Sequence, residues 1–180
     1  MKTLAIIGLI TLGLSTQAQN YIGEKCSIKF FSAAKLENID AENKVTKPVL
    51  NIEKNLFAIQ PQHTGFMFKS ALMQEHYNEN YMESEKFPYA KFTGKIKETI
   101  DYTKNGTNEI SIEGKLAMHG VELPRTITGT LTIKDGVIIM DSKFDVKVAD
   151  HNIKVPSLYV ESIAEVIQVT FHTEMTAMKK

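Results

Sequence analysis

The chain has only one cysteine, Cys26, among its 180 residues, so no disulfide within the chain and no cysteine-based zinc site can form. We interpret this lone thiol as a small packing residue. Excess charge is also missing, because 21 basic side chains balance 21 acidic ones. This balance argues against a nucleic-acid-binding protein, which needs a basic face. With 43% hydrophobic residues, the chain is not a disordered acidic one either.

Catalytic motifs are equally scarce. The sequence contains no G-x-S-x-G elbow, no phosphate-binding loop and no dinucleotide fingerprint. Its histidines do not fall at the spacing of a recognised metal site, and most histidines in such positions are structural. They are His63, His76, His119, His151 and His172. We therefore predict no catalytic residue, no metal site, no cofactor and no enzyme. A hydrolase or metal enzyme assembled from these scattered histidines is the competing class.

The N-terminus carries the three parts of a secretory signal peptide. Lys2 supplies a positive charge, residues 4–14 form an apolar stretch, and Thr16 and Ala18 place small side chains where signal peptidase reads them. The apolar stretch is too short to span a bilayer stably. We expect cleavage after Ala18, which leaves residues 19–180 as one domain, exported to the periplasm or the cell exterior.

Alternation of apolar and polar residues dominates the second half of the chain and predicts strands with one buried face. The alternating segments are 92–102, 110–118, 121–133, 138–148 and 163–175. The dipeptides Asn105-Gly106 and Asp135-Gly136 favour tight turns between consecutive strands. Weaker strand candidates lie earlier, at 27–33, 44–51, 55–60 and 64–69. This order predicts a consecutive antiparallel meander.

Long antiparallel strands with one apolar face favour closure into a barrel. We predict an all-β fold, an antiparallel barrel of about eight strands. Residues 71–81 lack β-branched side chains and predict one short helix, whose apolar stripe would cap one end of the barrel. A barrel of this size is either filled by its own side chains or holds one small ligand, and the pattern leaves both open.

Three segments, in this order, resemble the YceI-like family. The first runs from the pair His76-Tyr77 through an acidic stretch to residues 86–92 (KFPYAKF). The second is residues 114–121 (GKLAMHGV), and the third is residues 144–156 (FDVKVADHNIKVP). Together with the strand pattern, the resemblance extends roughly from residue 27 to the end.

This resemblance implies an extended, lipocalin-like form of the barrel. It also implies a non-catalytic exported protein that holds a long isoprenoid, such as a polyprenyl quinone or polyprenyl lipid, in an apolar interior. Such a carrier would contact a membrane transiently to exchange its ligand. A homodimer could form through exposed strand edges or a shared barrel mouth. The alternative function is an exported stress-related or structural barrel with a filled core and no lipid ligand.

Strand register selects the side chains that would line the interior, namely Phe68, Phe92, Ile112, Leu116, Ile127 and Phe144. For the polar head group of the ligand we predict His76 and Tyr77 beside the helix, and His119 or Arg125 near a strand end. Arg125 is the only arginine and lies on the apolar side of its strand. Its alternative role is a rim residue whose stem extends outward.

Overall fold

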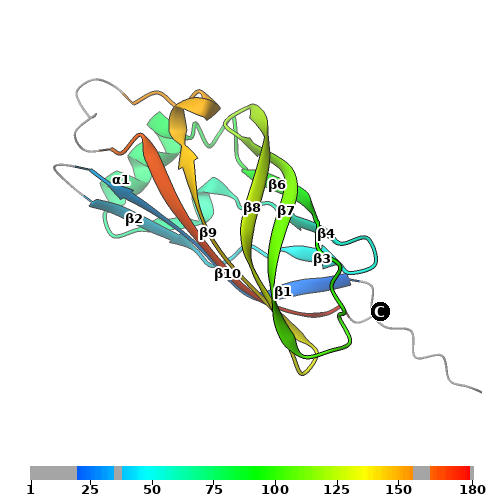
Figure 1. The fold of residues 1–180 in the computed structure, drawn as a ribbon. Helices are drawn as coiled ribbons and strands as arrows, with labels where there is room; N and C mark the ends of the chain where they lie inside the picture. Colours follow the sequence, from blue (N-terminus) through cyan, green and yellow to red (C-terminus); the bar gives the residue numbers. More distant parts are fainter. Residues whose placement is uncertain (1–19, 35–37, 156–162, 179–180) are drawn as a thin grey trace, which may run out of the picture.

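The computed structural model describes residues 20–34, 38–155 and 163–178 (Figure 1). The predicted signal peptide, residues 1–18, and its cleavage site lie outside this part of the chain. The strands are β1 (Asn20–Ala33), β2 (Asn38–Asn43), β3 (Val49–Asn51), β4 (Leu56–Ile59), β5 (Phe66–Phe68), β6 (Lys91–Ile96), β7 (Gly106–Met118), β8 (Val121–Lys134), β9 (Val137–Lys147) and β10 (Val166–Ala177). The helical segments are η1 (His63–Gly65), α1 (Ala71–His76), η2 (Tyr77–Tyr81) and η3 (Val148–His151). Across the described ranges, no helix has the length and apolar character that crossing a membrane requires.

Eight strands form a closed antiparallel ring in the order β1-β3-β4-β6-β7-β8-β9-β10, and the ring closes because β10 pairs with β1. This closing seam runs from Tyr21 opposite Ala177 to Phe31 opposite Gln168. Strands β6 to β10 are neighbours both in sequence and in the sheet. The predicted meander and the predicted barrel of about eight strands are therefore confirmed.

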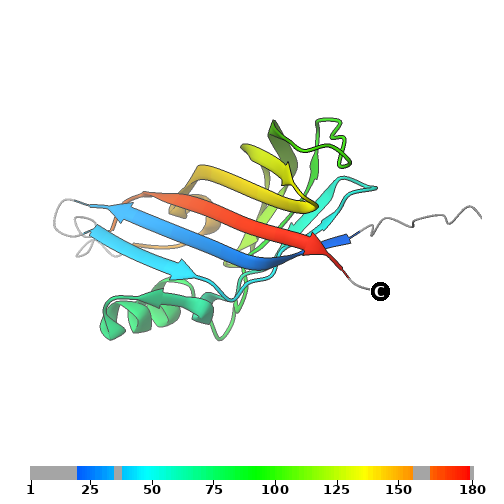
Figure 2. The same ribbon diagram turned by 90° about the horizontal axis from the view of Figure 1, so that it is seen from below.

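Along the edge opposite β10, strand β1 pairs first with one strand and then with another. Its first residues pair with β3, and its last residues pair with β2, which in turn pairs with β5. Figure 2 shows β1 between β10 and β2, with α1 on the far side of β2. Strand β5 is the last in the order on this side, and α1 follows it directly in the chain. From this edge of the sheet the chain therefore continues as a helix rather than as another strand.

The predicted strand at 44–51 is wrong over most of its length, because only its last three residues form β3. The buried side chain of Asn43 accounts for the difference. Its Oδ1 accepts hydrogen bonds from the backbone N–H groups of Val45 and Thr46, at 3.1 and 3.2 Å, and from the Thr46 hydroxyl at 2.9 Å. A side chain that binds neighbouring backbone donors competes with a sheet ladder, so the chain turns here.

Strand β6 ends at Ile96, although the alternation predicted a strand as far as residue 102. Asp101 accepts hydrogen bonds from the backbone N–H and the hydroxyl of Thr103, at 3.1 and 2.5 Å, and pairs with Lys104 at 2.8 Å. These contacts fold the segment into a turn, while Ile100 stays buried. The alternation marked a buried residue correctly, but it did not reveal where the strand ends.

The two predicted hairpin turns have different outcomes. At Asp135-Gly136 both residues have positive φ angles, 51° and 81°, so the predicted tight turn is confirmed. Asn105-Gly106 instead follows the turn built around Asp101, and Gly106 already belongs to β7. The turn in this connection therefore lies earlier than predicted.

The predicted helix at 71–81 is confirmed, because α1 continues directly into the single π-helical turn η2. Ser70 caps its N-terminus by accepting a hydrogen bond at Oγ from the backbone N–H of Met73, at 3.4 Å.

Cys26 is buried in the core, and burial raises the pKa of its thiol to about 12. Its interpretation as a packing residue is therefore confirmed.

Candidate functional site

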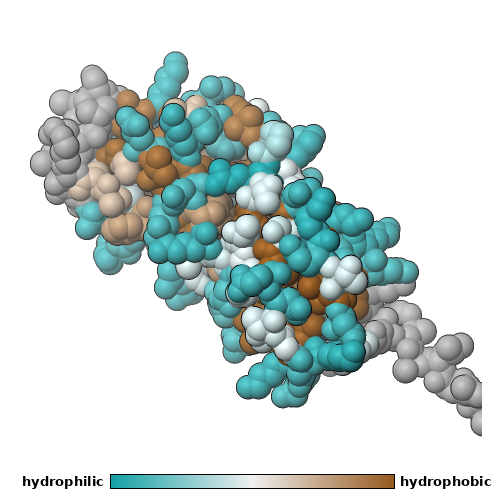
Figure 3. Space-filling model, in the orientation of Figure 1, coloured by the Kyte–Doolittle hydropathy of each residue, from teal (hydrophilic) through white to brown (hydrophobic). Residues whose placement is uncertain are grey.

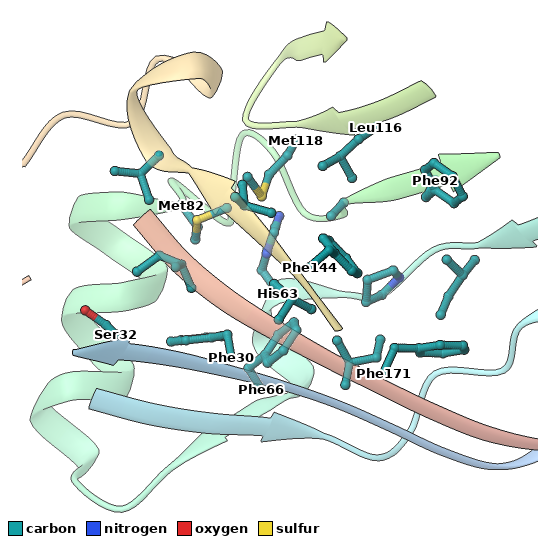
Figure 4. A pocket seen from close by; sticks show the side chains of 18 of the residues that line it. Phe30, Ser32, His63, Phe66, Met82, Phe92, Leu116, Met118, Phe144 and Phe171 are labelled. Atoms are coloured by element: carbon teal, nitrogen blue, oxygen red, sulfur yellow. The ribbon is translucent and has the colours of Figure 1, made fainter. Parts of the chain in front are cut away.

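The barrel interior is filled at one end and hollow at the other. Leu50, Leu131 and Met175 are completely buried in the filled part. The hollow part contains a cavity of about 470 Å³ whose wall is mostly apolar, and α1 and η2 contribute to this wall (Figure 4). Leu72 of α1 lines the cavity and is 59% exposed, so the cavity reaches solvent beside the helix. A cavity of this size is typical of a small-molecule site.

All six predicted lining residues and two of the predicted head-group residues lie in the cavity wall. They are Phe68, His76, Tyr77, Phe92, Ile112, Leu116, Ile127 and Phe144. The strands supply them at alternate positions, as their register requires, and the helical segment supplies the histidine and the tyrosine. Their role in binding a ligand stays a prediction.

An aromatic cluster centred on Tyr77 forms one side of the cavity. The ring of Phe30 lies 5.5 Å from that of Tyr77 in a stacked arrangement, and the rings of Phe66 and Phe68 lie 5.9 and 5.0 Å from it. Tyr77 thereby attaches the helical segment to β1 and β5. Burial raises the pKa of Tyr77, so its hydroxyl stays protonated.

His63 is a cavity residue that the sequence pattern did not single out. It is 1% exposed, and its Nδ1 lies 3.0 Å from the Tyr77 hydroxyl. Its Nε2 is buried and has no hydrogen-bond partner among the described residues. Burial, together with the nearby charge of His119, lowers the pKa of His63 to about 4. A neutral imidazole with one unused nitrogen therefore belongs to a mostly apolar wall (Figure 4).

The sequence offered no signal for His63, because it stands outside the alternating segments. Its position is set by η1, where its backbone N–H donates to the carbonyl of Pro88 at 2.9 Å. That contact joins two segments that are 25 residues apart and that no local pattern connects. Only the assembled fold places His63 beside Tyr77.

His119 does not line the cavity, and this placement does not support its predicted contact with a head group. Its Nδ1 lies 3.1 Å from the carbonyl oxygen of His151, and its Nε2 lies 3.2 Å from the carboxylate of Glu83. Each ring nitrogen of His119 therefore faces an oxygen that can accept a hydrogen bond. The ring of Phe87 packs 4.7 Å from that of His119.

The three segments that carry the family resemblance thus meet at one point. Phe87 comes from the first segment, His119 and Gly120 from the second, and His151 from the third. A Cβ on Gly120 would lie 2.8 Å from the Phe87 ring, so the close contact needs glycine. Gly120 also has a φ of 76°, which favours glycine. These residues join the β7–β8 turn to η3 and to the chain after η2, which is a structural role.

Strands β8 and β9 separate partway along their length. Their ladder runs from Lys134 opposite Val137 to Gly129 opposite Ser142, and within the described residues it contains no pair beyond that point. Where the strands part, Ser142 Oγ donates to the carbonyl of Thr128 at 2.6 Å. Figure 1 shows the two strands diverging from there towards η3.

Arg125 spans this separation and does not line the cavity. Its Nη2 donates to the backbone carbonyl of Asp145, and its Cζ lies 5.6 Å from the centre of the Phe144 ring. The placement does not support the predicted contact with a head group. It agrees better with the alternative prediction of a rim residue, because the guanidinium binds the backbone of the neighbouring strand.

The cavity wall carries few charges. Lys91 and Asp141 reach it from exposed positions, and Asp141 is hydrogen-bonded at 2.7 Å to His172. Among the residues that the structure describes, no three histidine, cysteine or acidic side chains come together as a metal site. The arrangement suits the burial of an apolar molecule with a small polar end.

Comparisons with known proteins agree with this fold. A family model of the YceI-like domain matches residues 25–175. No curated protein matches the chain. A solved polyisoprenoid binding domain from Saccharophagus degradans, implicated in plant cell wall breakdown, is similar with a TM-score of 0.76 and 13% identity, over 90% of this chain and 99% of that one.

Two further solved structures are similar. BcnA from Burkholderia cenocepacia has a TM-score of 0.66 and 14% identity, and the match covers 83% of this chain and 95% of that one. The YceI protein from Campylobacter jejuni has a TM-score of 0.56 and 14% identity, over the whole of both chains. At these identities, the likeness shows a common fold.

Proposed function

Because the chain belongs to the YceI-like family and encloses a largely apolar cavity, we propose that it is an exported carrier of a long isoprenoid lipid, such as a polyprenyl quinone or polyprenyl lipid. It binds this lipid and performs no chemistry on it. The cavity at the hollow end of the barrel is the observation that carries this proposal. The polyisoprenoid binding domain from Saccharophagus degradans has a similar fold and supports it.

The driving force for binding is the transfer of an apolar chain from water into the cavity. Each Å² of apolar surface that leaves water contributes about 25 cal/mol. The aromatic cluster around Tyr77 offers rigid contacts, while Met82 and Met118 offer flexible ones that adapt to a branched chain. A soluble barrel with such a cavity could carry a lipid that water alone does not dissolve.

Export follows from the predicted signal peptide, and the carrier would then act in the periplasm or outside the cell. To load and release its ligand it would contact a membrane transiently. The exposed Leu72 at the edge of the cavity supports this contact, because it places an apolar side chain where a membrane could be touched.

The test is native mass spectrometry of the protein purified from its own exported fraction, followed by organic extraction. We expect a chain that begins at Gln19 and carries one adduct, with extracted masses that differ by isoprene units. A bare chain, even with menaquinone-4 supplied in excess, would contradict the proposal. It would favour the alternative of a structural barrel without a lipid ligand.

A matched pair of variants separates cavity binding from surface adsorption. Val169 of β10 lines the cavity and is partly buried, whereas the next residue, Thr170, is exposed. Val169→Trp should fill part of the cavity and reduce the bound fraction of menaquinone-4, while Thr170→Trp should not. Equal binding by both variants would place the lipid outside the cavity.

A further inference from the structure

We propose that His63 donates a hydrogen bond from Nε2 to an acceptor oxygen at the polar end of the bound lipid. The site would then prefer an isoprenoid chain that carries a neutral carbonyl over the same chain as a hydrocarbon. This inference rests on the proposed function, because it assigns the polar contact of the same cavity. It makes His63 a specificity-determining residue.

The first observation is an unused polar atom. Two buried side-chain atoms of the described residues lack a hydrogen-bond partner, namely Nε2 of His63 and Oγ1 of Thr93. Of these two residues, His63 lines the cavity and Thr93 does not. A buried polar group without a partner is costly, so a ligand that supplies the partner gains affinity.

The second observation concerns which nitrogen of His63 carries the proton. The Tyr77 hydroxyl must donate its hydrogen, and the acceptor that the described structure places within reach is Nδ1 of His63, at 3.0 Å. If Tyr77 donates to Nδ1, the proton of the neutral ring sits on Nε2, and one donor is left without a partner. The opposite tautomer would leave two groups unsatisfied, the tyrosine hydrogen and Nε2. The first arrangement is therefore favoured, and Nε2 is a donor.

The third observation is that few positively charged side chains line the cavity. Burial keeps His63 neutral near pH 7, because its pKa is lowered to about 4. Among the described residues of the wall, Lys91 is the one lysine or arginine, and its side chain is exposed. A phosphate group would need several positive partners to leave water. A ketone or quinone oxygen needs only one donor, so a neutral acceptor fits this wall better than an anion.

The experiment compares two ligands that share one isoprenoid chain and differ only at its end. Geranylgeranylacetone is a ketone that accepts a hydrogen bond and donates none, and its deoxygenated hydrocarbon has the same isoprenoid chain. Binding of each is measured by native mass spectrometry on the mature protein and on its variants. The wild type should bind the ketone about three- to tenfold more tightly than the hydrocarbon, as expected for one hydrogen bond.

His63→Phe should abolish this preference while it still binds the hydrocarbon. Tyr77→Phe should weaken the preference, because the tautomer of His63 is then no longer fixed. Val169→Trp, which crowds the cavity from β10, should lower both affinities alike. Infrared spectra of a ketone labelled at its carbonyl carbon add a direct readout: the carbonyl band should lie at a lower wavenumber in the wild type than in His63→Phe.

Each outcome has one meaning. Equal binding of ketone and hydrocarbon by the wild type would overturn the role of His63 and leave the carrier function intact. A preference that survives in His63→Phe would overturn it as well. If neither compound bound, both the inference and the proposed function would fail.

The separation of β8 and β9 carries a second, independent inference: the geometry points to this gap as the route by which the lipid enters and leaves. The residues where the strands part, Gly129 and Ser142, line the cavity, and so does Phe144 on the β9 edge. In the view of Figure 3, hydrophobic atoms are visible between hydrophilic ones in the region where Figure 1 shows the strands apart. Arg125 crosses the gap through its bond to Asp145 and covers the face of Phe144.

If Arg125 holds this gap closed, Arg125→Met should speed the exchange of bound for free lipid. The side chain keeps its apolar length but loses the hydrogen bond, so exchange of deuterated for unlabelled geranylgeranylacetone should be about fivefold faster. Binding and release would accelerate together, with little change in affinity. Lys143→Met, on an exposed position of β9, is the control. Unchanged exchange in Arg125→Met would overturn this inference and leave the opening beside Leu72 as the route.

Discussion

The buried imidazole of His63 makes the stability of the barrel depend on pH in a defined window. Its pKa is about 4 in the folded protein and about 6.5 in an unfolded chain. Above pH 6.5 both states are neutral at this residue and no penalty arises. Between pH 6.5 and pH 4 the unfolded chain binds a proton that the folded protein does not, so stability falls as pH falls. Below pH 4 both states are protonated and the loss stops growing.

The magnitude follows from the difference between the two pKa values. The free energy of unfolding changes by up to about 1.4 kcal/mol per pH unit while only the unfolded state binds the proton. Across the window of about 2.5 units, the folded protein should lose about 3 kcal/mol through His63. That is a large share of the stability of an ordinary domain, about 5–15 kcal/mol.

Urea denaturation at a series of pH values from 7.5 to 4.5 measures this loss. The reference is His63→Gln, because glutamine does not titrate and can still accept a hydrogen bond from the Tyr77 hydroxyl. Protonation of carboxylates with lowered pKa values, such as Glu42 and Glu83, also destabilises the folded protein at low pH. This effect is present in both the wild type and the variant. The difference in the free energy of unfolding between wild type and variant therefore isolates the contribution of His63. A difference that stays constant across the series would refute the reasoning.

Three further predictions concern the barrel itself. Asn43→Ala should lower the free energy of unfolding by about 3 kcal/mol in urea denaturation, because it removes the acceptor of three hydrogen bonds and the donor to the Gln62 carbonyl at 3.1 Å. Gly114→Ala should cost about 2 kcal/mol or more in the same assay, since its Cβ would lie 2.2 Å from the carbonyl oxygen of Thr93. Cys26 should resist a thiol reagent at pH 8 in the folded protein and react once urea unfolds it, because burial raises its pKa to about 12.

Alternation was enough to predict the barrel because it reports which side of a strand faces the core. It identified the buried positions of β7, β8 and β9, and it placed Phe92 and Leu116 on the inner side. It could not report where a strand ends when a polar side chain captures the backbone. Asn43 and Asp101 do so: the predicted strand at 44–51 started too early, directly after Asn43, and the predicted strand at 92–102 ran past the turn at Asp101.

Positions in the cavity wall were predictable where strand register decided them, or the predicted helix in the case of His76 and Tyr77. All six lining residues follow from register, because a residue two positions along the same strand faces the same way. The polar residues depend on contacts between distant segments. His119 belongs to a junction with Glu83 and His151, and Arg125 serves a gap between strands, so neither reaches the cavity. His63 enters it through a turn that no periodic pattern marks.

The seam between β1 and β10 sets the order of events when the chain folds. It joins Tyr21 to Ala177, residues from opposite ends of the described chain, so the ring cannot close until both strands are present. Pairings between such distant residues slow folding, and we expect stopped-flow refolding on the order of milliseconds to seconds. Until the seam forms, β1 and β10 each present a free edge that could pair with another chain. During synthesis from the N-terminus, β1 can pair early with β2 and β3, but its edge that faces β10 stays free until the last strand is made.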